Sequence, residues 1–262
     1  MITSLSNVKV KAVRRLQNER RFRSQEKLFV VEGTRWLKEL LALARPAKTI
    51  FYTERWQNTA VHSQILQQLS DLGQSPLLLT SEDVMQAMSD TNTPAGILAV
   101  LEMQPCPLPK NPTLLLLLDG ISTPGNLGTM LRTAAAAGAD GLLLGPNSVD
   151  LYNPKVVRGS MGAHLRLPIH SKSWAEIAQI VEGMQVWVAT VEAEMCYTAV
   201  NWQKPSALII GSEAAGASSE TLAVATGNLT IPMQAATESL NAAMAAGIIL
   251  FEAVRQRNKI LR

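Results

Sequence analysis

Three polar segments in the second half of the chain contain residue types that could bind a ligand and assist a reaction. The first is DGISTPGNLGTMLR, in which Asn126 and Arg132 stand six positions apart. Backbone amides at the start of a helix and a guanidinium could together grip a phosphate there. The second is GSEAAGAS, in which Gly211 and Gly216 flank Glu213. A carboxylate at that place could accept from a ligand hydroxyl or orient an arginine.

The third segment is IPMQAATESLNAAMAAG, in which Pro232 ends an apolar run and Glu238, Ser239 and Asn241 open a helix. Taken singly, these residues are ordinary helix caps. The first two segments have equally plain interpretations, as a polar turn with a salt bridge and as a helix-capping acid. Spacing alone therefore leaves both the functional and the structural interpretation open.

Apolar runs near these segments indicate the strands that must position them. A continuous run that ends in turn residues is typical of a strand buried on both faces of a parallel sheet. Such runs occupy residues 114–120, 141–144, 186–189, 207–210 and 229–231. Helical patterns separate several of them, at residues 130–137, 174–181 and 240–257. The sequence thus predicts an open parallel α/β sheet, with ligands beyond the carboxyl ends of its strands.

The first hundred residues predict a second, smaller α/β structure. Short strands are expected at residues 29–31, 50–52, 77–79 and 97–101. Thr34 can cap a helix over RWLKELLALA, and Ser81 can cap another helix that begins with two acids. The proline-rich stretch PCPLPKNP cannot continue a helix or a central strand. We therefore predict a small α/β sandwich at 1–104, a linker at 105–112 and a main domain at 113–262.

Basic charge is concentrated at the start of the chain, although the formal net charge is only +3. Residues 1–48 hold twelve Lys or Arg against four Glu. The densest run comprises Arg14, Arg15, Arg20, Arg21, Arg23 and Lys27. Such a run attracts nucleic-acid phosphates, but it also fits a solvated helix face, and an acid-free start fits a targeting segment. Charge alone leaves these three alternatives open.

Composition excludes several classes of protein. With 47% hydrophobic and 17% charged residues, the chain is expected to form a compact globule. The longest apolar stretch, 242–251, is ten residues long, about half of the roughly 20 that a membrane-spanning helix needs. The two cysteines lie ninety positions apart, which predicts a reducing, cytoplasmic location. The three histidines lack the spacing of metal ligands, so no metal site is expected. The patterns G-x-G-x-x-G, G-x-x-x-x-G-K-[ST] and G-x-S-x-G do not occur, which disfavours dinucleotide-binding enzymes, P-loop enzymes and serine hydrolases.

In this order, the three polar segments resemble the motifs of the SpoU/TrmH family of SPOUT RNA 2′-O-ribose methyltransferases. The matching stretches read PGNLGTMLRTAAAAGADG, LIIGSEAAGAS and LTIPMQAATESLNAAMAAGIILFEA. The opening SLSNVKVKAVRRLQNERRFRSQEKLFVVEG is similar to the family's N-terminal RNA-binding domain, which is related to ribosomal proteins that bind kinked RNA. The resemblance implies a parallel-sheet domain with a deep trefoil knot. It also implies a homodimer through this domain, with both subunits contributing to each site.

The same resemblance implies a cofactor, a reaction and site residues. The cofactor is S-adenosylmethionine, with contacts expected at Gly211, Ile231 and Leu240. The reaction is an in-line attack of a ribose 2′-hydroxyl on the sulfonium methyl, so the protein must position and activate that hydroxyl. The catalytic residues are expected to be Arg132, Asn126, Glu213, Ser239 and Asn241. Because a guanidinium stays protonated in proteins, we expect Arg132 to stabilise the developing alkoxide rather than act as a base.

Some positions depart from the family pattern, and alternatives remain. Position 212 is Ser where many relatives have Asn, and Ala214 and Ala215 replace a common glycine and a bulkier neighbour. A catalytically silent RNA-binding or ribosome-assembly factor with the same fold is one alternative, and a base-modifying knotted enzyme is another. Ribosomal RNA is the expected substrate, because this N-terminal domain usually accompanies ribosomal targets in the family. Transfer RNA is the alternative substrate.

Overall fold

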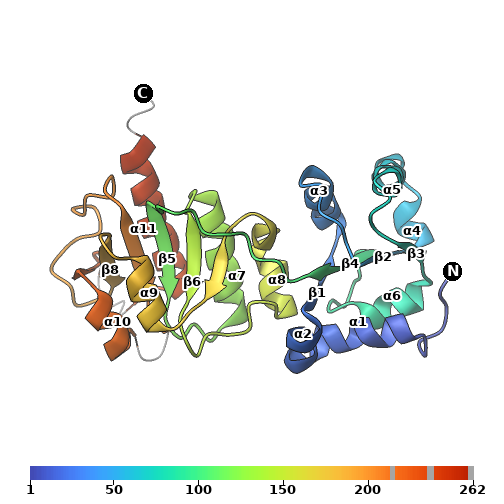
Figure 1. The fold of residues 1–262 in the computed structure, drawn as a ribbon, viewed down its shortest axis with the longest axis horizontal. Helices are drawn as coiled ribbons and strands as arrows, with labels where there is room; N and C mark the ends of the chain where they lie inside the picture. Colours follow the sequence, from blue (N-terminus) through green and yellow to red (C-terminus); the bar gives the residue numbers. More distant parts are fainter. Residues whose placement is uncertain (213–215, 235–238, 259–262) are drawn as a thin grey trace. The chain divides into compact units, whose positions relative to one another are not determined.

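The computed structural model describes residues 1–212, 216–234 and 239–258. The chain divides into two compact units (Figure 1). Unit 1 comprises Met1–Gln104 and Asp150–Gly162, and unit 2 comprises Pro105–Val149 and Ala163–Arg262. The segment Asp150–Gly162 thus packs with the first unit, although it lies far along the sequence. Boundaries of independently folding domains at residues 104 and 113 stay a prediction.

Unit 1 is an α/β sandwich around a mixed four-stranded sheet, as the apolar runs predict. In spatial order its strands are β1 (Leu28–Glu32), β4 (Ile97–Glu102), β2 (Thr49–Tyr52) and β3 (Leu77–Leu79). Strand β4 pairs antiparallel with β1 and β2, and β2 pairs parallel with β3. The helices are α1 (Val8–Asn18), α2 (Arg20–Glu26), α3 (Thr34–Ala42), α4 (Glu54–Gln57), α5 (Ala60–Asp71), α6 (Glu82–Met88) and α8 (Pro154–Ser160). Helices α1 and α6 lie on one side of this sheet, and α3 and α5 lie on the other.

The two helix caps expected in unit 1 have different outcomes. Ser81 caps α6 as predicted, because its hydroxyl accepts from the backbone N–H of Val84 at 3.3 Å. Thr34 is not a cap, since α3 begins at Thr34 itself and its N-cap is Gly33. The Thr34 hydroxyl instead accepts a hydrogen bond from Trp56 Nε1 at 2.9 Å. The prediction for Thr34 was wrong because a tertiary partner uses its oxygen.

The basic run at the start of the chain is only partly available to a ligand. Arg23 is 4% exposed and forms an ion pair with Asp150, with 2.6 Å between Nη2 and Oδ2. Its Nη1 also donates to the carbonyl oxygens of Leu16 and Gln17. A buried guanidinium requires such partners, because an unpaired buried charge is strongly destabilising. Arg23 therefore holds α2 to α1 and to residue 150, while the other basic residues of the run are exposed.

Unit 2 is built on a six-stranded sheet in which all neighbouring strands are parallel, as predicted. In spatial order the strands are β10 (Gly227–Leu229), β8 (Gln185–Ala189), β9 (Ser206–Ile210), β5 (Leu114–Leu118), β6 (Gly141–Leu144) and β7 (Ile169–Ser171). All five leucines of β5 are buried, because helices cover both faces of the sheet. Strand β7 is missing from the sequence prediction, since its residues IHS form no apolar run.

The helices of unit 2 are α7 (Pro124–Ala136), α9 (Trp174–Ile180), α10 (Ser219–Val224) and α11 (Ala242–Arg257), with a short 3₁₀ turn η1 (Ala163–Leu165). Helix α9 packs its apolar side on alternate residues of β5, and α7 packs against α11. Helix α7 begins at Pro124 rather than at residue 130, because the fixed φ of proline suits the first helical position.

The deep trefoil knot that the family resemblance implies for unit 2 stays a prediction. Among the described helices, none is long and apolar enough to cross a membrane.

The proline-rich segment at 105–112 is extended and packs along unit 2. Leu108 joins the apolar cluster that contains Leu115 and Leu143. The carbonyl oxygen of Cys106 lies 2.9 Å from His170 Nε2, which donates to it. These contacts attach the segment to the sheet and distinguish it from a freely moving tether.

Candidate functional site

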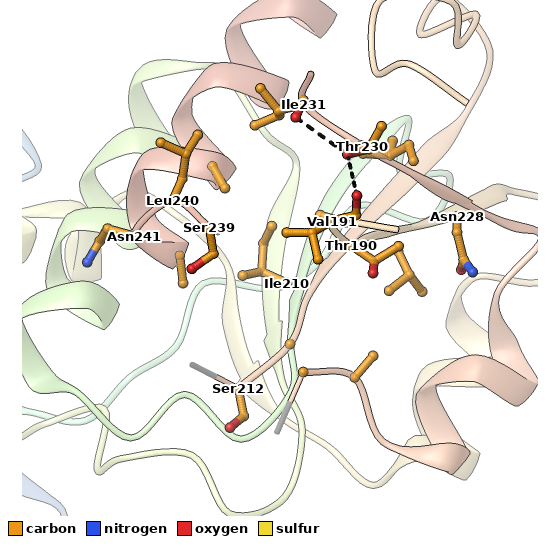
Figure 2. A pocket seen from close by; sticks show the side chains of 18 of the residues that line it. Thr190, Val191, Ile210, Ser212, Asn228, Thr230, Ile231, Ser239, Leu240 and Asn241 are labelled. Atoms are coloured by element: carbon orange, nitrogen blue, oxygen red, sulfur yellow. Dashed lines mark hydrogen bonds between the residues drawn. The ribbon is translucent and has the colours of Figure 1, made fainter. Parts of the chain in front are cut away.

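A pocket of about 730 Å³ lies beyond the carboxyl ends of β8, β9 and β10, beside the start of α11 (Figure 2). This edge is where an open parallel sheet is expected to bind its ligand. Ser239 and Leu240 lie on one side of the pocket and Thr190 and Asn228 on the opposite side, with Ile210 between them. The lining combines apolar side chains with hydroxyl and amide groups, and main-chain atoms of several loops border it. Such a lining suits a ligand that has both an apolar ring and polar substituents.

The loop after β9 forms one wall of the pocket and folds back on itself. Ser212 and Gly216 exchange two backbone hydrogen bonds of 2.9 Å each. A Cβ atom on Gly211 would overlap the carbonyl carbon of Gly216 and lie 2.6 Å from the backbone nitrogen of Ala217. Gly216 has φ of +69°, a conformation that favours glycine. The two glycines are thus required for the backbone to make this tight wall.

A buried carboxylate, Asp119 at the end of β5, fixes the far end of this loop. Its Oδ2 accepts from the backbone N–H of Ser218 at 2.7 Å and from the Thr221 hydroxyl at 2.6 Å. At the start of α10, the Glu220 carboxylate accepts hydrogen bonds from its own backbone N–H and from the Ser219 hydroxyl. These two bonds lower the pKa of Glu220. A negative charge at a helix N-terminus is favourable. Asp119 therefore sets where the loop ends and where α10 begins.

We expect replacement of Asp119 with alanine to weaken the binding of S-adenosylmethionine by about tenfold or more. The loop would lose two hydrogen bonds to a charged acceptor, and the pocket wall would no longer be held in place. Asp119→Asn keeps an oxygen acceptor in the same position, so it should restore most of the affinity. Titration calorimetry of the three proteins measures this effect. Equal affinities for the alanine variant and the original protein would exclude this role for Asp119.

Two asparagines expected at the site lie in direct contact. Asn241 Nδ2 donates to Asn126 Oδ1 at 3.0 Å, which joins the start of α11 to the first turn of α7. Asn241 Oδ1 accepts from the backbone N–H groups of Ala243 and Met244 and so caps α11. The cap fixes the orientation of the Asn241 amide and directs its nitrogen toward α7. Asn241 also lines the pocket.

The remaining predicted residues have different positions. Gly211, Ile231, Ser239 and Leu240 all line the pocket. Arg132 lies on the exposed side of α7 and is not among the described residues that line the pocket. Glu213 falls outside the described part of the chain, as do Ala214, Ala215 and Glu238. The structure thus gathers Asn126, Asn241 and the positions predicted to contact the cofactor at one edge, with Arg132 farther along α7.

Sequence reasoning missed three residues that help to form the site. Thr190, just after β8, and Asn228, within β10, line the pocket. Asp119 was placed within the first polar segment but was given no function. Thr190 and Asp119 lie at or just after the carboxyl end of a predicted strand, which marks them as candidates, whereas Asn228 precedes the run predicted at 229–231. The missing information was the strand order, in which β8 lies between β10 and β9.

Comparison with known proteins gives matches over both units. The SpoU rRNA Methylase family matches residues 113–251. The MRM3-like substrate binding domain matches residues 7–99. The 23S rRNA (guanosine(2553)-2'-O)-methyltransferase RlmP of Bacillus subtilis is 32% identical, over 95% of this chain and 97% of that protein.

Two solved structures that carry the cofactor are similar over nearly the whole chain. The AdoMet-bound rRNA methyltransferase of Sinorhizobium meliloti has a TM-score of 0.85 and 30% identity, covering 97% of both chains. The SpoU methyltransferase AviRb of Streptomyces viridochromogenes in complex with AdoMet has a TM-score of 0.85 and 28% identity. That match covers 96% of this chain and 98% of AviRb.

Proposed function

This chain belongs to the SpoU rRNA methylase family, and from that premise we propose that it methylates ribose 2′-hydroxyl groups of ribosomal RNA. S-adenosylmethionine is the methyl donor, in line with the cofactor-bound relatives. The observation that carries the proposal is the pocket at the carboxyl edge of the unit 2 sheet, with the Asn126–Asn241 contact beside it. The segments that carry the family motifs form the Asn126–Asn241 contact and much of the pocket lining.

The residues of the pocket fit S-adenosylmethionine. A volume of about 730 Å³ accommodates a ligand of this size, and Leu229, Ile231 and Leu240 offer apolar surface to an adenine ring. The close packing at Gly211 brings main-chain groups to the pocket surface, where they can bind polar parts of the cofactor. When bound, the cofactor supplies a methyl group on a sulfonium centre, which an oxygen nucleophile can attack.

We assign the chain's own polar groups to the handling of the RNA. Asn126 and Asn241 hold each other in one orientation, so the amide groups at this edge are ready to contact the ribose without rearrangement. Arg132 is assigned to act through the charge of its guanidinium, by binding the phosphate next to the target ribose and stabilising the developing alkoxide. Ser239 lines the pocket beside them, and Glu213 is assigned to the same polar group by its motif position.

We further propose that the protein acts as a homodimer through unit 2. Arg132 is exposed and does not itself line the described pocket, so a second copy offers a way to complete each site. Helix α11 also presents Met244 and Phe251 to solvent, at 58% and 50% exposure. They are seven residues apart and share one side of the helix. Large apolar side chains on one exposed helix face are typical of a protein interface.

The double variant Met244→Glu, Phe251→Glu should therefore convert the dimer to a monomer. Each apolar side chain loses its burial at the interface, and we expect the dimer dissociation constant to rise by at least about 100-fold. Analytical ultracentrifugation measures this change. Val61→Glu is the matched control, because Val61 is 56% exposed on α5 of unit 1. An original protein that sediments as a monomer, or a double variant that remains dimeric, would contradict the proposed interface.

Calorimetry with S-adenosylmethionine tests the enzyme against a silent factor with the same fold. We expect saturable binding of the cofactor, followed by transfer of labelled methyl groups to ribosomal RNA. Failure to bind the cofactor would favour the RNA-binding or ribosome-assembly alternative. Transfer to transfer RNA but not to ribosomal RNA would correct the substrate, and a product that is cleaved by alkali would indicate a modified base.

A further inference from the structure

Unit 1 contains a second pocket, of about 180 Å³, which is formed by residues outside the three polar segments. It is formed by α1, β1, α3, the loop after α6 and α8, all within this unit. Val30 and Trp36 give it apolar walls, and both side chains are buried. The volume corresponds to about six water molecules, which is the scale of one nucleobase and much less than a whole nucleotide chain. The unit 1 pocket is thus suited to a single small planar group.

Two hydrogen-bond acceptors of this pocket are the Gln17 amide oxygen and the Glu32 carboxylate. Gln17 Nε2 donates to the carbonyl oxygen of Met88 at 3.1 Å, which fixes the amide, and Gln17 Oε1 is buried with no donor among the described residues. The Glu32 carboxylate accepts from the Ser89 hydroxyl at 2.7 Å and from the backbone N–H of Ala95 at 2.8 Å. The Thr91 hydroxyl donates to it at 3.4 Å. These bonds hold the carboxylate in place, and a carboxylate has further acceptor capacity. A ligand with adjacent N–H donors would match this arrangement.

Two charged residues form the rim of the pocket. Arg158 Nη1 and Asp90 Oδ2 lie 2.6 Å apart, and half of the Arg158 side chain is exposed. An ion pair of this kind holds the guanidinium plane in a defined orientation, and such planes stack on unstacked RNA bases. Gln17 belongs to α1, and Arg14 of the same helix is exposed. Phosphates on either side of an inserted nucleotide would therefore meet positive charge beside the pocket.

We propose that the unit 1 pocket receives one extruded nucleobase of the RNA substrate and that guanine is the preferred base. Guanine presents N1–H and the 2-amino group on one edge. We assign the 2-amino group to Gln17 Oε1 and N1–H to the Glu32 carboxylate. Protein carboxylate and amide groups read the edges of unstacked RNA bases in this way. The inference rests on RNA as the substrate, and it adds that unit 1 selects a guanosine at a fixed place in the target.

Short single-stranded RNAs test this proposal directly with the full chain. The three probes are UUGUU, UUIUU with inosine at the centre, and UUUUU, measured by fluorescence anisotropy at one salt concentration. Inosine lacks only the 2-amino group, so we expect UUGUU to bind about tenfold more tightly than UUIUU. In Gln17→Met the acceptor is lost at similar side-chain length, and the ratio of the two affinities should fall to about one. Equal binding of the guanine and inosine probes to the original protein would overturn the proposal.

Arg158→Ala and Arg55→Ala form a matched pair of variants. They separate base binding in the unit 1 pocket from general electrostatic attraction of RNA. Both arginines lie in unit 1, are exposed and form one surface ion pair each, with Asp90 and Glu82 respectively. Arg158→Ala should weaken the binding of UUGUU more than the binding of UUUUU, whereas Arg55→Ala should change both affinities by the same factor. Equal effects of both variants on both probes would contradict the stacking role, and these two variants decide the matter if Gln17→Met does not fold. Methyl transfer to ribosomal RNA without guanine preference would overturn this inference alone, whereas absent methyl transfer would overturn the proposed function.

Discussion

Replacing Arg132 with alanine is expected to lower the rate of methyl transfer by about 10²- to 10³-fold while the affinity for S-adenosylmethionine stays nearly unchanged. The guanidinium is assigned to charge that develops on the ribose oxygen, so its loss should act on the transition state. The residue lies on the exposed side of α7 and is not among the described residues that line the pocket at the sheet edge. Single-turnover transfer of a labelled methyl group, together with calorimetry, separates the two effects.

The control variants for Arg132 distinguish its geometry from its charge. Arg132→Lys keeps the charge but loses the planar, two-pronged donor, so we expect it to recover only part of the rate. Lys172→Ala removes one positive charge elsewhere in unit 2, where Lys172 pairs with Glu176 at 2.8 Å, and should leave the rate unchanged. Normal turnover in Arg132→Ala would remove this arginine from the mechanism.

The second large effect is expected at Gly211, where alanine should weaken cofactor binding by about 10- to 100-fold. The added Cβ would lie 2.6 Å from the backbone nitrogen of Ala217 and would overlap Gly216. Because these neighbours are backbone atoms, they cannot rotate away, and the loop after β9 would have to move. Calorimetry with S-adenosylmethionine measures the loss, and thermal unfolding shows whether unit 2 remains folded.

Gly247→Ala is the matched control for the added methyl group. A Cβ on Gly247 would lie 3.5 Å from Thr133 Cγ2, an ordinary contact, and alanine is the better helix former in α11. Its cofactor affinity should equal that of the original protein. If Gly211→Ala also bound the cofactor normally, the wall formed by Gly211 and Gly216 would have no part in the site.

Much of the fold could be predicted from the sequence because apolar runs report buried strands directly. The run at β5 is buried along its whole length, and the neighbouring parallel strands produce similar runs. Strand β7 escaped prediction because its register with β6 depends on backbone pairing, and only Ile169 of its three residues is buried. The ion pair between Arg23 and Asp150 could not be predicted either, because the two residues are 127 positions apart and no local pattern links them.

The candidate site likewise contains residues that could be predicted from the sequence and residues that could not. The motif positions that line the pocket could be predicted because the resemblance transfers them residue by residue. Asp119 could not, because its partners Ser218 and Thr221 reach it only through the adjacency of β5 and β9. The contact between Asn126 and Asn241 likewise requires α7 and α11 to pack together. Residues whose role depends on strand or helix neighbours therefore need the structure.

The most direct measurement is a map of alkali-resistant linkages in ribosomal RNA from cells that lack the gene, complemented with the original protein or with Arg132→Ala. A 2′-O-methyl group blocks alkaline cleavage at the modified nucleotide. We predict a resistant linkage in ribosomal RNA that appears with the original protein and is absent with the alanine variant. An identical map in all of these cells, with no resistant linkage that depends on the protein, would contradict the assigned reaction.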